Sequence, residues 1–579
     1  MTNSADNLTR RGFIVASAAV AAAGSTATSG STAPVRTADS SHPPQPEGDQ
    51  PDPPTDEITA TDFEHAQKLA GLEFTPEQLD MVAQRHSRVV ERYRARREQP
   101  LPNSLALATV FDPRQSRPHG ASQRSVFVRS GNRPGPLPSQ DVDIAFAPVT
   151  SLSRWIESGE LSSRRLTQIY LTRLERHDPA LKCVITLTRD RALAQAAAAD
   201  REIAAGTYRG PLHGIPWGAK DLFDTANIPT TFGAAPYKDR VPDNDAAVVR
   251  KLDEAGAVLV AKLTLGALAM GDVWFGGKTR NPWNTEQGSS GSSAGPAAST
   301  AAGLVGFTLG TETLGSIVSP SMRCGVTGLR PTFGRVPRTG AMALCWSLDK
   351  VGPLCRTVED CALVLDAIRG EDPGDPSAID MPLNFDANAP IEDLRIGYDP
   401  AWFESRGTTD IDRAALGAMR TLGAKLVEIK LPEMQTGPLR TILNVEAASA
   451  FEELTLTGRD NELVRQSAQA WPNSFRKAWF VPAVEFVQAQ RIRRKVCEQM
   501  QTVFDDVDLL FGPSFAGGLL LITNNTGHPS LTLRAGFRTN NRPHGVTLWG
   551  RLFEEGELCR VGIALEQELG VWNKRPLLG

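Results

Sequence analysis

Serine hydroxyls and one lysine stand in glycine-rich surroundings at three places in the chain. Residues 291–295 read Gly-Ser-Ser-Ala-Gly, residues 310–316 read Gly-Thr-Glu-Thr-Leu-Gly-Ser, and residues 213–221 read His-Gly-Ile-Pro-Trp-Gly-Ala-Lys-Asp. Glycine is favoured where backbone must approach backbone closely, or where N–H groups must converge on a bound atom. These residue types together indicate a serine nucleophile, a base that activates it and an oxyanion hole.

A lysine can act as that base only when it is neutral. Its free pKa is about 10.4, so a pKa near 7 requires about 4 kcal/mol of desolvation in a dry pocket. Taken singly, a serine in such a turn usually bonds to backbone, and Lys220 beside Asp221 would usually form a surface ion pair. His213 and His528 flank these segments, but neither has a carboxylate at a spacing that indicates a Ser-His-Asp triad, so a histidine triad is not favoured.

Strands and helices alternate from about residue 141 to the C-terminus, and this alternation predicts an α/β fold. The periodicity places helices at residues 152–158, 162–177, 189–205, 246–255 and 412–422. It places strands at residues 183–187, 257–261, 394–397, 425–429, 509–512 and 530–533, with strand and turn at 212–217 and 221–223. Residues 440–500 are amphipathic, and we expect them to form helices that cover one end of the sheet.

The N-terminal part differs in composition from the rest. Residues 1–33 contain Arg10-Arg11, a short apolar run and small residues, the layout of a twin-arginine export signal. Residues 34–56 are rich in proline and acids and are expected to form a disordered tether. Residues 57–140 are expected to form a helical extension and a connecting segment, and residues 141–579 the catalytic domain. In the extension, one helix begins near Thr61, and a second begins at Thr75 and continues to about Arg97.

Charge and cysteine content exclude several classes of function. The 579 residues carry a formal net charge of −4 and no basic run with interleaved aromatics, which argues against nucleic acid as a partner. The seven cysteines form no Cys-x-x-Cys pair, so buried free thiols are expected rather than a zinc site or a disulfide framework. The sequence does not exclude one disulfide among Cys345, Cys355 and Cys361. No stretch is long and apolar enough for a stable membrane span.

Four further motifs accompany the three glycine-rich segments along the chain. They are Asn-Pro-Trp-Asn at 281–284, Cys-Gly-Val-Thr-Gly-Leu-Arg-Pro-Thr at 324–332, Asp-Lys-Val-Gly-Pro at 349–353 and Gly-His-Pro at 527–529. Over about residues 141–579 the chain resembles the amidase signature family. The resemblance implies a central mixed, twisted β-sheet covered by helices on both faces. It also implies hydrolysis of a small carboxamide without metal or organic cofactor.

The family motifs assign roles to individual residues. The serine of the Gly-Ser-Ile element is the nucleophile, here Ser316, and the family spacing of 24 residues to the second serine selects Ser292 over Ser289. The family lysine falls on Lys220. Ser292 would then relay the proton between Lys220 and Ser316, and the Gly291–Ser292 peptide would be cis. The backbone N–H groups expected in the oxyanion hole are those of Thr313, Leu314, Gly315 and Ser316. Substrate contacts are expected from Met270, Gly291 and Ser293.

The turn before the nucleophile departs from the family pattern. Glu312 replaces an aspartate, Leu314 replaces a glycine, and Val318 replaces an arginine. A buried carboxylate without its guanidinium is costly, so we expect Arg323 to supply the missing charge to Glu312. Leu314 can still donate its backbone N–H if the turn does not require a positive φ there.

Three functions remain open. The leading one is an exported amidase, periplasmic or extracellular, which acts as a monomer or homodimer and converts an amide to an acid and ammonia or an amine. The second is the glutamine-hydrolysing subunit of a tRNA-dependent amidotransferase, although an export signal and a long tether argue against it. The third is a catalytically decayed amidase-fold binding protein, suggested by Leu314 and Val318.

Overall fold

The computed structural model describes residues 58–84, 86–114, 125–131 and 133–578. The export signal predicted at 1–33 and the tether predicted at 34–56 lie outside the described residues. None of the helices in the described ranges is both long and apolar enough to cross a membrane.

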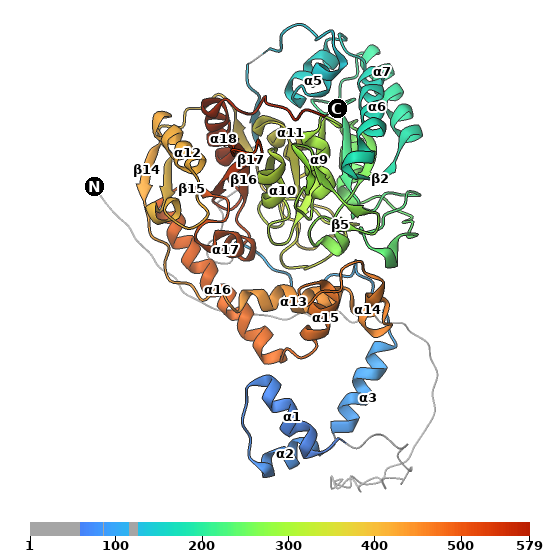
Figure 1. Ribbon diagram of the computed structural model, residues 1–579, viewed down its shortest axis with the longest axis vertical. Helices are drawn as coiled ribbons and strands as arrows, with labels where there is room; N and C mark the ends of the chain where they lie inside the picture. Colours follow the sequence, from blue (N-terminus) through green and yellow to red (C-terminus); the bar gives the residue numbers. More distant parts are fainter. Residues whose placement is uncertain (1–57, 85, 115–124, 132, 579) are drawn as a thin grey trace, which may run out of the picture. The chain divides into compact units, whose positions relative to one another are not determined.

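A mixed sheet forms the centre of the described chain (Figure 1). Within the described residues it has 11 strands, in the spatial order β14 (Lys425–Glu428), β13 (Arg395–Tyr398), β15 (Leu509–Pro513), β17 (Pro543–Gly550), β16 (Ser530–Phe537), β10 (Thr327–Arg330), β11 (Lys350–Cys355), β9 (Phe307–Glu312), β3 (Pro216–Lys220), β4 (Val258–Leu263) and β2 (Val184–Leu187). Strand β13 runs parallel to β14 and β15, and β3 runs parallel to β4 and β9, while the other pairs are antiparallel.

Three short strand pairs lie outside this sheet. They are β1 (Val126–Val128) with β12 (Asn384–Asp386), β5 (Val273–Trp274) with β6 (Gly277–Lys278), and β7 (Arg280–Asn281) with β8 (Asn284–Gly288).

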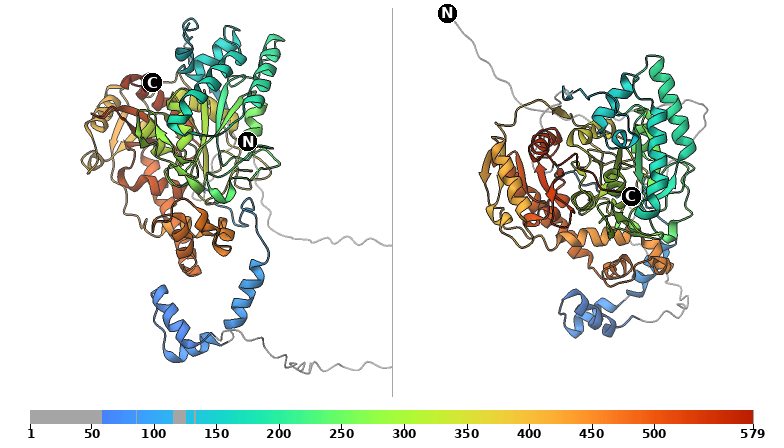
Figure 2. Two further views of the ribbon diagram at one scale, coloured as in Figure 1. Left: turned by 45° about the vertical axis from the view of Figure 1, so that its right-hand side comes forward. Right: turned by 45° about the horizontal axis from the view of Figure 1, so that its top comes forward.

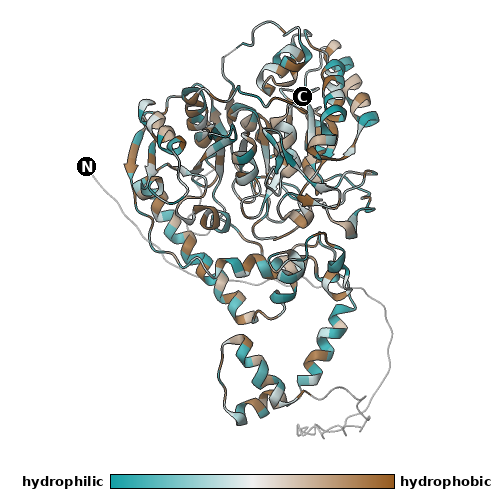
Figure 3. Cartoon of the chain, in the orientation of Figure 1, coloured by the Kyte–Doolittle hydropathy of each residue, from teal (hydrophilic) through white to brown (hydrophobic). Residues whose placement is uncertain are grey.

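Helices flank the main sheet, so the expected α/β architecture is confirmed (Figure 2). The helices from residue 141 onward are α4 (Asp141–Ala145), α5 (Val149–Glu157), α6 (Ser163–Leu181), α7 (Arg189–Ala204), α8 (Ala247–Glu254), α9 (Ala294–Ala301), α10 (Val318–Cys324), α11 (Val358–Ile368), α12 (Asp410–Thr421), α13 (Leu439–Ala450), α14 (Glu452–Leu456), α15 (Trp471–Ala478), α16 (Ala483–Asp506), α17 (Leu519–Thr526) and α18 (Glu555–Leu569), of which α13–α15 lie beyond one end of the sheet. Apolar and polar residues interchange along them in Figure 3, as amphipathic helices require.

The register of the central strands brings the chemistry-bearing segments together. All residues of β3 and β9 are buried, and the two strands pair in parallel with Trp217 opposite Phe307 and Ala219 opposite Leu309. Parallel strands end at the same edge of a sheet, so Lys220, at the end of β3, lies near the end of β9. The turn that contains Ser316 follows β9 directly.

The predicted boundaries agree with the structure to within a few residues for most elements. The helix expected from Thr75 to about Arg97 is wrong, because two helices occupy this region, α2 (Pro76–Ala83) and α3 (His86–Arg97). The chain turns out of the helical conformation at Gln84, where ψ is 125°. The first helix, α1 (Ala60–Ala70), begins one residue before Thr61 and contains no buried residue.

Candidate active site

Lys220 is the last residue of β3 and is completely buried. Its Nζ donates to Thr311 Oγ1 at 2.8 Å, to Ser292 Oγ at 2.9 Å and to Ser293 Oγ at 3.2 Å, and it lies 3.4 Å from the carbonyl oxygen of Thr311. Burial lowers the pKa of Lys220 to about 7, partly opposed by the negative charges of Asp349 and Glu312. A large fraction of this lysine is therefore a neutral amine at physiological pH, the form a base requires.

Ser292 reaches Lys220 through an unusual turn. The Gly291–Ser292 peptide bond is cis, as expected. A Cβ at Gly291 would lie 1.8 Å from the carbonyl oxygen of Gly271, so only glycine fits here. Helix α9 begins two residues after Ser292, and the Ser293 N–H donates to the carbonyl oxygen of Ser316 at 3.2 Å. This hydrogen bond fastens the two serine-bearing segments to each other.

Ser316 stands between β9 and α10 in a tight turn. Gly315 adopts a φ of +91°, whereas Leu314 is not among the residues with positive φ, so the glycine-to-leucine departure causes no backbone strain. The backbone N–H groups of Thr313, Leu314, Gly315 and Ser316 have no hydrogen-bond acceptor among the described residues. They are therefore available to a developing oxyanion.

Glu312 holds this turn from beneath. Its carboxylate accepts from the N–H groups of Ile317 at 2.7 Å and Val318 at 2.9 Å, and it pairs with Arg330 at 2.7 Å. Burial by itself raises the pKa of Glu312, but the charge of Arg330 and the N–H donors outweigh it and lower this pKa to about 2. The expectation that Arg323 supplies the positive charge is wrong, because the Arg323 side chain is exposed while Arg330 reaches Glu312 from β10.

Two further groups were not singled out from the sequence. Thr311 accepts a hydrogen bond from Lys220, and Asp349 accepts from Thr313 Oγ1 at 2.5 Å and from the N–H of Leu344 at 2.8 Å. Both belong to motifs visible in the sequence, but which way a strand residue faces becomes clear only once the register is known.

The three residues predicted to contact the substrate, Ser293, Gly291 and Met270, have different surroundings. Ser293 is fully buried and contacts Lys220 and the Thr311 carbonyl, so its hydroxyl positions the lysine. Gly291 serves the close approach to Gly271, and Met270 lies in the adjoining segment, half-buried.

The residues given no catalytic role also have partners of their own. Asp221 pairs with the buried Lys262 at 2.9 Å. His213 contacts Glu202 at 3.2 Å, and His528 Nδ1 contacts Thr526 at 2.7 Å. Ser289 donates to the neighbouring Ser290 carbonyl at 3.0 Å, not to the lysine.

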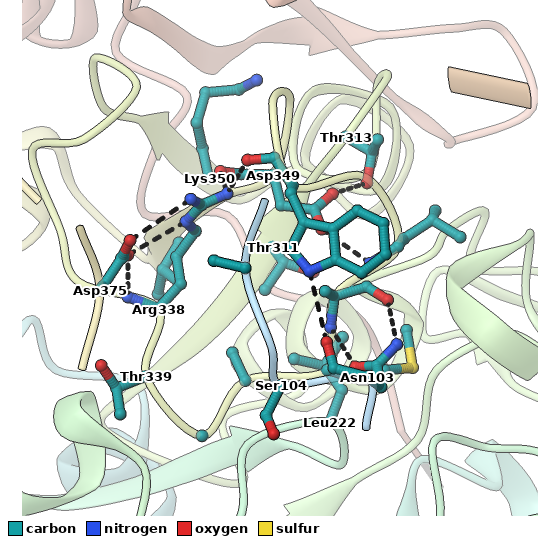
Figure 4. Close-up of a pocket in the computed structure, with 18 of the residues that line it drawn as sticks. Asn103, Ser104, Leu222, Thr311, Thr313, Arg338, Thr339, Asp349, Lys350 and Asp375 are labelled. Atoms are coloured by element: carbon teal, nitrogen blue, oxygen red, sulfur yellow. Dashed lines mark hydrogen bonds and ion pairs between the residues drawn. The ribbon is translucent and has the colours of Figure 1, made fainter. Parts of the chain in front are cut away.

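A cavity of about 80 Å³ borders Thr311 and Thr313 (Figure 4). Its wall is mainly apolar and includes Leu222 and Met342. One side is formed by Asn103, Ser104 and Ala106, which lie in residues 101–106 of the N-terminal extension, here called the strap.

Asn103 fastens the strap. Its Nδ2 donates to the carbonyl oxygens of Ala343 at 2.8 Å and Ala450 at 3.1 Å, and its Oδ1 accepts from the Ala343 N–H at 2.8 Å. A second cavity of about 470 Å³ shares Asn103 and Ser104 with the first. The strap therefore borders both cavities, of which the one at Thr311 and Thr313 is here called the inner cavity.

The fold and this constellation together define an amide hydrolase. The family model for amidases matches residues 165–559, and the chain belongs to the amidase family. It is 34% identical over 487 residues to a glutamyl-tRNA(Gln) amidotransferase subunit of Methylococcus capsulatus, a match that spans 74% of this chain and 98% of that relative.

Solved structures show the same relationship. The peptide amidase from Stenotrophomonas maltophilia superposes with a TM-score of 0.66 and 31% identity, over 74% of this chain and 98% of that one. A glutamyl-tRNA(Gln) amidotransferase subunit from Thermotoga maritima gives a TM-score of 0.62 and 25% identity, over 75% and 96%. The chain is thus an enzyme that hydrolyses amide C–N bonds. Within the described residues, no group of three or more His, Cys, Asp or Glu side chains is arranged to hold a metal ion.

Proposed function

We propose that Ser316 is the nucleophile, Ser292 the proton relay and Lys220 the base of this amidase. The observation that carries the proposal is the contact of 2.9 Å between the buried Lys220 Nζ and Ser292 Oγ, together with the lowered pKa of the lysine. A neutral amine can take the Ser292 proton, while Ser292 takes the proton of Ser316.

The reaction then proceeds in two balanced halves. Ser316 Oγ adds to the amide carbon, and its proton passes through Ser292 to Lys220. The four N–H groups of residues 313–316 would hold the oxyanion, a single such donor being worth about 3 kcal/mol. When the C–N bond breaks, the proton returns to the leaving nitrogen and ammonia or an amine departs. Water repeats the sequence on the acyl-enzyme and releases the carboxylic acid.

The cavity at Thr311 and Thr313 supports a proposal on the substrate class. Its small volume fits a compact acyl group, and its largely apolar surface, to which Arg338, Asp349, Lys350 and Asp375 add charged groups, favours an apolar one. The Stenotrophomonas neighbour is a peptide amidase, so peptide amides with a small apolar terminal residue belong in the first panel of candidates. We propose that this enzyme acts on primary amides of that kind.

Covalent labelling tests the residue roles. A fluorophosphonate probe should modify Ser316 in the wild-type protein, and Ser316→Ala should abolish both labelling and amide turnover. Ser289→Ala is the matched control, since Ser289 donates to its neighbour's carbonyl and should leave labelling unchanged. A folded wild-type protein that is neither labelled nor active on the amide panel would favour the decayed binding protein instead.

A second candidate is glutamine hydrolysis in an amidotransferase. It is favoured by the similarity to the Methylococcus amidotransferase subunit, which extends over nearly all of that relative. The test is release of ammonia from free glutamine, with and without co-purifying proteins. Turnover of simple amides by the purified chain without glutaminase activity would reject this candidate.

We also propose that the enzyme is exported through its twin-arginine segment and works as a monomer or homodimer. The support for export is the sequence of residues 1–33. Replacing Arg10 and Arg11 by lysine should retain the protein inside the cell. Arg36→Lys, an arginine outside the paired segment, is the control and should be exported as the wild type is. Unchanged export of the double variant would contradict the proposal.

A further inference from the structure

Three arginines line a cavity at the end of α10 opposite to the catalytic serine. The cavity has a volume of about 250 Å³, and Arg323, Arg538 and Arg542 contribute to its wall, together with Gln287 and His544. Arg323 belongs to α10, whereas Arg538 and Arg542 belong to the connection between β16 and β17. Helix α10 and β17 lie side by side, in agreement with Figure 1.

The close packing of these two elements fixes the position of the cavity. Gly325 ends α10 with a φ of +67°, and a Cβ there would lie 2.6 Å from Pro543, next to Arg542. The carbonyl oxygens at this helix end already have donors, because Asn281 Nδ2 bonds to Arg323 O at 2.8 Å and Trp283 Nε1 bonds to Cys324 O at 2.8 Å. The helix end therefore leaves its carbonyl groups satisfied and presents a guanidinium to the cavity.

The positive charges of the cavity are not neutralised by the protein. Within the described ranges, none of the three guanidinium groups forms an ion pair with a carboxylate, and no Asp or Glu lines the cavity. Arg538 donates to His544 Nδ1 at 2.9 Å, and His544 Nε2 contacts Asp412 at 2.9 Å, so the nearest buried carboxylate is already engaged. Asp412 also accepts from the Thr409 N–H at 2.8 Å.

Arg542 provides the second observation. One of its terminal nitrogens donates to Gln287, but its Nε is buried and has no acceptor among the described residues. A buried N–H of a charged group without a partner is unfavourable. Three guanidinium groups that line one cavity without a carboxylate, in a chain of net charge −4, are the features of a site that binds an anion.

We propose that this cavity binds a small oxyanion of the phosphate type, either the free ion or the phosphate group of a small monoester. The planar guanidinium offers two parallel N–H donors to two oxygens of such an ion, which distinguishes it from a monovalent halide. The site is distinct from the serine site, because it lies at the C-terminal end of α10 while Ser316 precedes the N-terminal end. The proposal does not depend on the assigned catalytic roles.

Calorimetric titration of the full chain in chloride buffer tests the proposal. Inorganic phosphate and glycerol 3-phosphate are titrated separately, and the tighter of the two identifies the source of the oxyanion. Saturable binding with a stoichiometry of one is expected. Arg542→Gln and Arg538→Gln should each raise the dissociation constant by about tenfold or more, since each removes charge-assisted hydrogen bonds.

The controls separate a site from general salt effects. Arg440→Gln removes one exposed arginine outside the cavity and should bind as the wild type does. Phosphate also stabilises proteins without a site, because it is excluded from their surface. If the arginine variants bind phosphate as tightly as the wild type, or the wild type shows no saturable heat, the proposal is wrong. Should an Arg538 or Arg542 variant fail to fold, Arg323→Gln, at an exposed side chain, provides the same comparison.

Discussion

At the scale of single residues, the function depends on an ionisable side chain that is buried away from water. Lys220 has no exposed surface, and its partners are three hydroxyl groups and one carbonyl oxygen. None of these partners carries a charge that could hold the proton on the lysine. Burial therefore lowers the pKa without a compensating ion pair in contact with the amine.

The first prediction concerns the pH dependence of activity. Because the pKa of Lys220 is lowered to about 7, the neutral base is lost below that pH. We expect kcat/KM to fall about tenfold per pH unit below 7 and to level off above it. The profile is measured between pH 5 and 9 with an aryl amide. A profile that is flat through pH 7 would contradict the role of the lysine.

The same shift affects stability with a definite sign. The folded pKa lies below the unfolded value of 10.5, so between about pH 7 and 10.5 the unfolded chain binds more protons than the folded one. The contribution of Lys220 to the free energy of unfolding therefore rises with pH across this window. Lys220→Met should remove this dependence, which denaturant titrations at pH 7 and pH 9.5 can measure.

The second prediction concerns the buried pair of Glu312 and Arg330. Arg330→Met leaves the Glu312 carboxylate without its guanidinium, which should destabilise the fold by about 3–5 kcal/mol. Arg323→Met is the matched control, and at an exposed side chain it should change stability by less than about 0.5 kcal/mol. Urea titration in chloride buffer compares the two. Equal effects of both variants would show that the pair does not have this role.

The same carboxylate makes the free energy of unfolding decrease at low pH. The folded pKa of Glu312 is lowered to about 2 from an ordinary value of 4.5, so its stabilising contribution is complete above about pH 4.5. This contribution is lost as the pH falls towards 2, because the unfolded chain takes up the proton first.

At the scale of elements, the strap is a part of the N-terminal extension that contacts the catalytic domain. Besides the hydrogen bonds of Asn103, the connecting segment is anchored by Phe111, whose ring centroid lies 3.4 Å from the Arg493 guanidinium carbon. The strap lies outside residues 165–559, which match the family model, yet it forms part of the wall of the inner cavity. We expect the extension to influence substrate choice without changing the residues around Lys220.

The third prediction tests this contribution to specificity. Asn103→Ala removes the hydrogen bonds to Ala343 and Ala450, and should loosen the strap. We expect kcat/KM to rise for amides with bulky acyl groups relative to compact ones, by a factor of about 10, as expected for a change of about 1–3 kcal/mol in a pocket contact. A series of acyl amides of increasing size measures the ratio. Asn388→Ala, at an exposed site on another part of the chain, should leave the ratio unchanged; an unchanged ratio in Asn103→Ala would refute the role of the strap.

At the scale of the whole molecule, the interior contains every cysteine as a free thiol. All seven are buried and free, including Cys345, Cys355 and Cys361. The disulfide that the sequence did not exclude among these three is therefore absent. Burial raises the pKa of the Cys345 and Cys361 thiols well above the ordinary value. Both the lack of access and the lack of thiolate make these groups unreactive in the folded protein.

The fourth prediction follows from this burial. An aromatic disulfide reagent should react with less than about one equivalent of thiol in the native protein and with seven after unfolding in guanidinium chloride, because only the unfolded chain exposes the thiols. Absorbance of the released thiolate is the measurement. Rapid reaction of several thiols in the native protein would show that the core opens readily.

The sequence by itself was sufficient for the family, for the α/β alternation and for placing the two serines and the lysine in one site. These conclusions rest on local spacing, which the chain carries in one dimension: the interval between Ser292 and Ser316 separates Ser292 from its neighbour Ser289. Glycine positions also predicted close backbone approach, as found at Gly291. These local patterns predict the fold correctly because the backbone constraints that favour a residue type at a position also act on that position in the folded protein.

Only the tertiary structure decided which distant groups meet. Arg330 rather than Arg323 neutralises Glu312 because β10 is buried in the sheet, whereas the Arg323 side chain faces solvent. The unassigned Thr311 contacts Lys220 because β3 and β9 pair in parallel, and Asn103 borders the inner cavity although hundreds of residues separate it from Ala343 and Ala450. Strand register, burial and long-range contact depend on how the elements pack together, and sequence separation does not specify that packing.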